Sequence, residues 1–597
     1  MHCAVVMLES FSFVGQVPPW VVDWLTPLWL MSLGVLLGLI SLGVLWLVCA
    51  GLSRIPVIGS LKDDPQRFRI AGLICGFGVF AVTVAFLTTS GGSLLAGEDQ
   101  GGLSLTQILG LAIPVLLICL GLGFTMVTLV SKRTIDETWL TFHEGPLWGI
   151  GILFGLIAIY GILGISLVRD PDQIVLSFTR LGSVGEQDPI ELTIPGVDTQ
   201  RGLNEDPEPT AVAVSFRQEE LEAIIFDSNR RLVISGFEDS AALGYREIDV
   251  TDDEVVRWDA RTTPTNPFPK GEVTEIFVSN FSEEDADLKL TLVTSIQYPE
   301  VMTIPLSALF VVVIFVVYFA HRNALPKISA VALSTFKTSV IQPFYIILLI
   351  IGLFLIVLFL YLPYNTFGED IKMLKDAGLT LIKVLAVLSA VWASSTAITD
   401  EIEGRTALTV LSKPIRRQSF IIGKFLGINW ATMLMFVVLG TALLFVVSYM
   451  PFHEAKEGAD DMPSWQTVHF ETFAIIPGLC LALMATVVLT GLSVALSTRL
   501  PMLANLITCF SIYVLGHLTP LLVQSAAVGD QFEVVMFVAQ LIATVLPNLE
   551  HFDMQAAITS GRSVPMMYLA WSSVYCLVYS LIALLLSLIL FEDRDVA

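Results

Sequence analysis

The sequence predicts a mostly α, polytopic membrane protein with about eleven spans and one inserted extracytoplasmic domain of the β-sandwich type. Hydrophobic residues make up 54% of the 597 residues, charged residues make up 15%, and the mean hydropathy is +0.76. The apolar residues gather in long runs, and one acidic region with short β-branched segments interrupts them. A soluble fold of this length could not bury so much apolar surface, so the composition excludes that class.

Each of the apolar runs is long enough to cross a bilayer as a helix, which takes about 20 residues for a hydrocarbon layer of roughly 30 Å. The runs lie at 24–52, 70–89, 108–130, 147–168, 303–320, 343–362, 378–399, 425–449, 472–496, 502–523 and 566–591. A further run, Val534 to Leu546, is too short to cross and is bounded by Pro547. We expect a re-entrant or surface helix there.

The basic residues predict the orientation of these spans. Sixteen Lys and Arg lie in the loops of one side and four in the short loops of the other. The basic side comprises 53–69, 131–146, 321–342, 400–424, 497–501 and the tail after Leu590. Because positive residues mark cytoplasmic loops, we expect the C-terminus in the cytoplasm, and the N-terminus and 169–302 outside the cell (inner) membrane. The first span opens with Trp20, Trp24 and Trp29, which we expect to be interfacial anchors.

The region 169–302 holds 28 acidic and 11 basic residues, a balance of −17 within a chain total of −23. Its short, partly alternating runs, separated by Gly, Pro, Asn and Asp, predict a β-sandwich without a strong hydrophobic helix. The expected strands are 174–178, 190–194, 211–216, 223–226, 231–235, 274–278 and 287–293. The acidity keeps an exposed domain soluble; a cation-attracting or partner-docking surface is the alternative.

Two ionisable residues lie inside the predicted spans. Lys383 is near the outer end of its span, where its long stem can carry the ammonium group to the interface. His517 lies beside Tyr513, and we expect it to be a satisfied packing residue rather than part of a proton path. No His or Cys pair has metal-ligand spacing, and no grouping suits hydrolysis, so we expect neither a metal site nor an enzyme.

The segment 400–424 packs charge and helix-breaking residues between two apolar runs. Asp400, Glu401 and Glu403 fall in the first turn of an expected cytoplasmic helix, where the helix dipole favours anions. Arg405 follows Glu401 at the spacing that pairs acid with base along a helix. An ordinary positive-inside loop is the alternative interpretation.

A basic turn ends this expected helix. Pro414 stops the helix and forces Lys413 out of the helical region. Arg416 and Arg417 then precede the next apolar run, as basic residues do on the cytoplasmic side.

The segment resembles the cytoplasmic coupling segment of ABC-2 type transporter permeases. In that family an acidic helix start leads through a Leu-Ser-Lys-Pro-like turn into a Gly-Lys-Phe-Leu-Gly membrane entry. The matching pieces are Glu401 to Arg405, Leu411 to Pro414, Gly423 to Gly427, and outside the segment Ile328 to Gln342, Phe367 to Lys375, Leu546 to Phe552 and Ser560 to Arg562. The resemblance covers about residues 325–597, and some similar sequences belong to the branch associated with multi-copper enzyme maturation.

The resemblance implies the membrane-spanning subunit of an ATP-driven transporter, an exporter that works with a separate cytoplasmic ABC ATPase. It also implies a dimer with itself or a related permease. Asp400, Glu401, Glu403 and Arg405 would transmit the push of the ATPase, Pro414 would fix the bend, and Lys413, Arg416 and Arg417 would complete the coupling site. The chain has no Gly-x-x-x-x-Gly-Lys-Ser/Thr loop, so we expect it to bind no cofactor itself and ATP to bind the partner.

These patterns predict four parts, which are a four-span N-terminal bundle at 1–168, the external β-domain at 169–302, a linking helix at 303–324 and a six-span permease domain at 325–597. We expect the lipid bilayer and protein subunits as partners, and no nucleic acid. Two alternatives remain open. One is an envelope scaffold or sensor without transport, and the other is an ion-coupled secondary carrier, which would need charged residues at mid-membrane.

Overall fold

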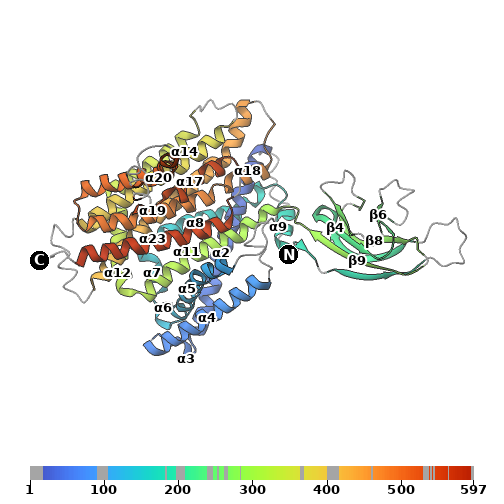
Figure 1. Ribbon diagram of the computed structural model, residues 1–597, viewed down its shortest axis with the longest axis horizontal. Helices are drawn as coiled ribbons and strands as arrows, with labels where there is room; N and C mark the ends of the chain where they lie inside the picture. The colour runs from blue at the N-terminus through green and yellow to red at the C-terminus, as the bar shows by residue number, and fades with distance from the viewer. Residues whose placement is uncertain are drawn as a thin grey trace, which may run out of the picture. The chain divides into compact units, whose positions relative to one another are not determined.

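The computed structural model describes residues 18–62, 64–89, 105–181, 185–187, 189–196, 209–237, 247–251, 255–260, 267–269, 271–282, 284–362, 369–399, 416–458, 461–528, 537, 541, 545–561 and 564–592. The chain divides into two compact units (Figure 1). The helical unit comprises Met1–Val168 and Ile304–Ala597, and the β-unit comprises Arg169–Thr303.

The first part of the helical unit contains α2 (Pro19–Ser53), α3 (Pro56–Gly59), α4 (Pro65–Thr89), α5 (Leu105–Leu129), α6 (Lys132–Asp136), α7 (Thr138–Glu144), α8 (Leu147–Leu163) and η2 (Gly164–Leu167). Its second part contains α11 (Thr303–Ala324), α12 (Pro326–Ile341), α13 (Pro343–Phe359), α14 (Asp370–Ser394), the π-helical turn η6 (Ser395–Thr399), α17 (Arg417–Gly458), α18 (Trp465–Phe473), α19 (Ile476–Ser497), α20 (Met502–Val528), η7 (Leu549–Phe552), α22 (Gln555–Thr559) and α23 (Met566–Glu592).

The described residues include eight helices long and apolar enough to cross a membrane, or nine if the bent pair α12 and α13 forms one span. The eleven predicted spans lie on described helices, which confirms the helical membrane fold. The run Val534 to Leu546, where a re-entrant or surface helix is expected, lies mostly outside the described residues. The total of eleven stays a prediction, because α5 and α20 qualify over their described parts only as shorter apolar helices. The bend of 61° follows from Pro343, which holds Gln342 in an extended conformation between the two helices.

The permease part of the helical unit is built around α14, α17 and α19. Figure 1 shows these helices side by side with α23, and α12 lies along α17. Two glycines permit the close approach of α12 and α17. A Cβ atom at Gly423 would lie 2.6 Å from the Cβ of Val331, and one at Gly427 would lie 2.5 Å from the carbonyl oxygen of Ala332.

The tryptophans of α2 attach this helix to its neighbours. Trp24 Nε1 donates a hydrogen bond of 3.0 Å to Ser448 Oγ on α17. Trp29 Nε1 donates one of 2.9 Å to the carbonyl oxygen of Gly161 on α8, and only 1% of Trp29 is exposed. The prediction that Trp29 is an interfacial anchor is therefore wrong, because its indole is packed inside the unit and satisfied there.

The β-unit is a sandwich of two antiparallel sheets, as the sequence predicts. Its elements are α9 (Pro171–Thr179), β1 (Gly185–Glu186), β2 (Ile190–Ile194), β3 (Thr210–Arg217), η4 (Gln218–Glu220), β4 (Leu221–Ser228), β5 (Leu232–Ser235), β6 (Ile248–Val250), β7 (Val256–Asp259), β8 (Glu272–Asn280), β9 (Ala286–Thr294) and η5 (Pro299–Met302). One sheet has the order β1-β9-β4-β7, with β2 also paired to β9, and the other has the order β3-β8-β5-β6. Side chains of both sheets share one core, in which Phe226 and Leu290 of the first sheet join Ile234 and Val278 of the second.

Six of the predicted strand segments are strands, and the segment 174–178 is not. That segment belongs to α9, a nine-residue amphipathic helix, so the strand predicted there is wrong. Pro171 opens the helix with a preset φ, Asp172 lies in its first turn, and Ile174 and Ser177 are buried on one face. The short strands β1, β6 and β7 were not predicted.

Candidate coupling site

The structure defines the two ends of the predicted coupling segment. The predicted residues that lie outside the described part of the chain are Asp400, Glu401, Glu403, Arg405, Lys413 and Pro414. Arg416 and Arg417 are described, and both are exposed at the start of α17. The candidate site is therefore built from the helix ends that hold 400–415, namely η6 before it and α17 after it.

The first end is fixed by a hydrogen bond to another helix. Thr399, the last residue of η6, donates its hydroxyl to the carbonyl oxygen of Ser497 at 3.0 Å. The carbonyl oxygen of Leu500 lies 3.3 Å from the same hydroxyl. Thr399 is 2% exposed, and π-helical turns often occur at functional sites. The bond ties the end of α14 to the end of α19, so a displacement of one end moves the other.

A buried polar cluster reinforces this junction. Ser394 on α14 and Ser493 on α19 share a hydrogen bond between their hydroxyls. Asn505 on α20 donates from Nδ2 to Ser395 Oγ at 2.8 Å and to Ser493 Oγ at 3.0 Å, and its Oδ1 accepts from Cys509 Sγ at 3.3 Å. Interhelical side-chain hydrogen bonds contribute about 0.6–2 kcal/mol each in membrane proteins. The cluster thus joins α14, α19 and α20 directly beside the coupling segment.

The second end rests on the C-terminal end of α23. Arg417 NH1 donates to the carbonyl oxygen of Glu592 at 3.0 Å, and Arg499 Nε donates to that of Leu590 at 2.9 Å. The ring of Phe420 stacks on Phe591 with centroids 5.8 Å apart. Guanidinium groups at the carboxyl end of a helix satisfy its free carbonyl groups and its dipole. Sequence reasoning assigned Arg417 to coupling and missed Arg499, whose partner lies 91 residues away.

The same helical unit contains a buried ion pair far from these ends. Lys383 lies sixteen residues before Thr399 on α14, which is about 24 Å along a helix. Its Nζ lies 3.0 Å from Asp553 Oδ2 and 3.4 Å from His517 Nε2, and its side chain is 5% exposed. Asp553 therefore compensates the charge of Lys383 inside the unit, and the expected position of Lys383 near the outer interface stays a prediction.

His517 combines two contacts. Its ring packs against Tyr513 as expected, with centroids 4.5 Å apart, and its Nδ1 lies 2.9 Å from the Tyr513 carbonyl oxygen. If Nδ1 carries the proton and donates to that carbonyl, Nε2 is free to accept from the Lys383 ammonium. A second buried lysine, Lys375, forms an ion pair with Glu471 on α18. The sequence did not reveal the partners of these two lysines, and the carrier alternative would need such groups at mid-membrane.

The comparison with protein families decides the identity of the chain. A model of the ABC-2 family transporter proteins matches residues 144–596. The chain belongs to this family. It is an ABC-2 type permease, as the resemblance implied, and the match starts before residue 325 and so includes the β-unit. No curated protein matches the chain. The relation to the branch of multi-copper enzyme maturation stays a prediction, and the described residues contain no group of three or more His, Cys, Asp or Glu that could hold a metal ion.

Proposed function

We propose that this ABC-2 permease is energised by a separate cytoplasmic ATPase that binds the segment 400–424, and that it works as an exporter. The observation that supports the proposal is the anchoring of both ends of this segment to other helices. Thr399 attaches one end to α19, and Arg417 attaches the other to α23. A force applied to a segment that is anchored at both ends is transmitted to the helix bundle and is not taken up by movement of the segment alone.

The proposed cycle uses ATP on the partner subunit only. Nucleotide binding closes the ATPase dimer, which displaces the helix expected at 400–413 and tilts the spans on either side of it. Asp400, Glu401, Glu403 and Arg405 carry the contact, and Pro414 fixes the bend. Since six spans form half a pathway in this family, the permease pairs with a second copy or a related permease.

The proposed orientation places residues 400–424 and the C-terminus in the cytoplasm and the β-unit outside the inner membrane. A single cysteine can test it in a background without native cysteines. Asp227→Cys on β4 should react with a membrane-impermeant thiol reagent in intact cells, and Arg416→Cys only after permeabilisation. Both positions are exposed. Labelling of both from the same side would contradict the orientation.

Replacement of residues 400–415 by a Gly/Ser linker of equal length tests the energising role. The wild-type chain, purified from its native host, should bring down a soluble protein that hydrolyses ATP, and the linker variant should not. The matched control replaces residues 363–368, the connection before α14, by Gly and Ser. Equal recovery of the ATPase with all three proteins would reject the coupling role of 400–415.

A specific observation favours a second candidate, the ion-coupled carrier. The buried pair of Lys383 and Asp553, with His517 beside it, has the composition of an ion or proton pathway in a membrane protein. The two candidates differ in their energy source. Transport that continues when the ATPase is inactivated, and stops when the proton gradient is collapsed, would favour the carrier.

A further inference from the structure

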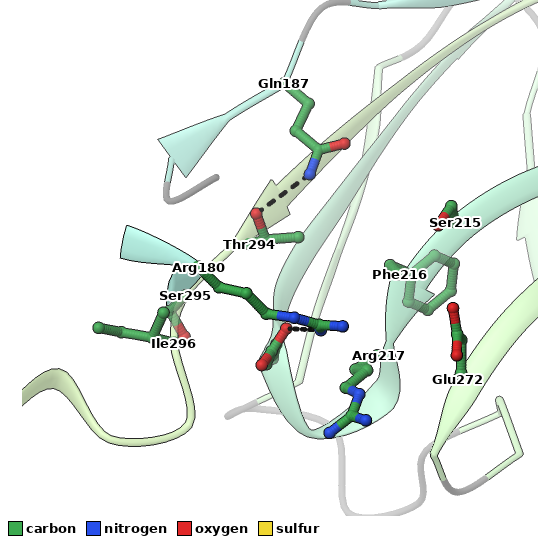
Figure 2. Close-up of a pocket in the computed structure, with 10 residues that line it drawn as sticks. Arg180, Gln187, Ser215, Phe216, Arg217, Glu272, Thr294, Ser295 and Ile296 are labelled. Atoms are coloured by element: carbon green, nitrogen blue, oxygen red, sulfur yellow. Dashed lines mark hydrogen bonds and ion pairs between the residues drawn. The ribbon is translucent and has the colours of Figure 1, made fainter. Parts of the chain in front are cut away.

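The β-unit contains a polar cavity of about 200 Å³ at one end of the sandwich. Figure 2 shows its lining, which comes from both sheets and from the segments that follow α9 and β9. Arg180 follows α9, and Ser295 follows β9. In the sequence, the residues that line the cavity are therefore close to both segments that connect the β-unit to the membrane helices.

Hydrogen bonds hold one wall of this cavity in place. Arg180 NH1 donates to Glu220 Oε2 at 2.8 Å, and the Glu220 side chain is 11% exposed. The backbone N–H of Ser295 donates to the carbonyl oxygen of Glu220 at 2.7 Å. Gln187 Nε2 lies 3.4 Å from Thr294 Oγ1, as the dashed line in Figure 2 shows. This wall is ordered by its own contacts, and the Arg180 charge is already compensated.

The opposite wall carries two opposite charges, Arg217 and Glu272, which face each other across neighbouring strands but form no ion pair within the described part of the chain. Arg217, at the end of β3, forms no ion pair or side-chain hydrogen bond within the described part of the chain, and its Nε is buried without a partner. Glu272, at the start of β8, is its direct neighbour across the strands. Neither of these two side chains lies within 4 Å of an opposite charge among the described residues. A buried guanidinium nitrogen without an acceptor is costly, so this wall suits a ligand that supplies one.

We propose that this cavity binds a small zwitterion of the size of an amino acid. The α-carboxylate pairs with the Arg217 guanidinium, whose planar fork matches a carboxylate, and the α-ammonium pairs with the Glu272 carboxylate. The cavity carries two arginines and two glutamates, so its net charge is zero and a zwitterion adds none. The rest of the unit is strongly acidic, which disfavours a free anion there. The β-unit is then a ligand-binding domain of the permease, which goes beyond the proposed coupling to an ATPase.

Equilibrium binding to the full-length protein in lipid nanodiscs tests the proposal, with a radiolabelled mixture of the common L-amino acids as the probe. The wild type should bind saturably. Arg217→Gln should weaken binding by about tenfold or more, because a hydrogen-bonded charge is lost. Arg257→Gln is the matched control. It removes the same charge from an exposed position on β7 outside the cavity, and it should leave the affinity unchanged.

A second variant and two competitors keep the test decisive if Arg217→Gln misfolds. Glu272→Gln alters an exposed side chain and should weaken binding of amino acids but not of their N-acetyl derivatives. Unlabelled amino-acid amides, which lack the carboxylate, should not displace the probe. Absence of saturable binding to the wild type, equal affinity in Glu272→Gln, or displacement by the amides would each overturn the proposal. Recovery of the ATPase is measured separately, so failure here leaves the coupling proposal standing.

Discussion

The hydroxyl of Thr399 lies 3.0 Å from the carbonyl oxygen of Ser497, so the last described residue before the coupling segment is bonded to the last residue of α19. The bond closes a polar junction that also contains Ser394, Ser493 and Asn505. Because the junction lies at the root of the segment, a change there should affect coupling more than stability.

Thr399→Val removes this hydroxyl at nearly constant volume. We expect the free energy of unfolding to fall by only about 1 kcal/mol, since one hydrogen bond is lost. The measurement is the rate of ATP hydrolysis by the ATPase alone and in the presence of the permease. The wild-type permease should change this rate, and the Thr399→Val permease should not. Thr486→Val is the control, because Thr486 is buried and its hydroxyl donates to the Ala482 carbonyl of its own helix. Equal behaviour of the two variants would contradict the role of the junction.

The ion pair of Lys383 and Asp553 predicts an asymmetry between single variants. Asp553→Leu leaves the ammonium of Lys383 buried and uncompensated, which costs about 3–5 kcal/mol. Lys383→Met leaves Asp553, whose side chain is 23% exposed, and should therefore cost less. The double variant should recover most of the loss. The apparent melting temperature of the purified protein in detergent measures all three, and additive losses would show that the pair does not interact.

Gly427 allows α17 to approach α12, where a Cβ atom would lie 2.5 Å from the Ala332 carbonyl oxygen. Gly427→Val should therefore destabilise the helical unit by about 1–3 kcal/mol or more and lower its apparent melting temperature. Gly155→Val on α8 is the control, since a Cβ atom there meets nothing within 4 Å. An equal, small effect of both substitutions would mean that α12 does not pack on α17 in this way.

The sequence predicted the membrane helices because each needs only a local run of apolar residues. It failed at 174–178 because Ile174 and Val175 are β-branched, although Pro171 and Asp172 carried the helix signal. The sequence predicted where the coupling segment lies but not the contacts that anchor its ends, since Thr399 and Ser497 are 98 residues apart. The partner of Lys383 was missed for the same reason, because Asp553 lies 170 residues further along the chain.

The β-unit offers a test of pH dependence. Arg231 donates two hydrogen bonds to Asp249, at 3.0 and 2.8 Å, and this lowers the pKa of the Asp249 carboxyl from its ordinary value of 3.8. A carboxyl whose pKa is lowered by folding stabilises the fold above its unfolded pKa, and this contribution is lost as the pH falls through the folded value. Because the pair is exposed, we expect Arg231→Gln to cost less than about 1 kcal/mol at neutral pH.

Thermal unfolding at several pH values measures the difference in stability between the wild-type full-length protein and Arg231→Gln. It should be present at neutral pH and should shrink as the pH falls below 3.8. A difference that grows in acid would contradict the assigned sign. High salt should reduce the difference at neutral pH, since exposed pairs are screened.

Recovery of the partner ATPase with the Glu401→Lys permease tests the coupling of this chain to an ATPase most directly. A local pair of Glu401 with Arg405, as the sequence predicts, would contribute only about 0.3–0.5 kcal/mol, too little to decide folding. Charge reversal at an interface costs several kcal/mol, so the variant should insert normally and lose the ATPase. A further Arg405→Glu change would restore the predicted local pair and should rescue little. Undiminished recovery of the ATPase with the Glu401→Lys protein would contradict the account.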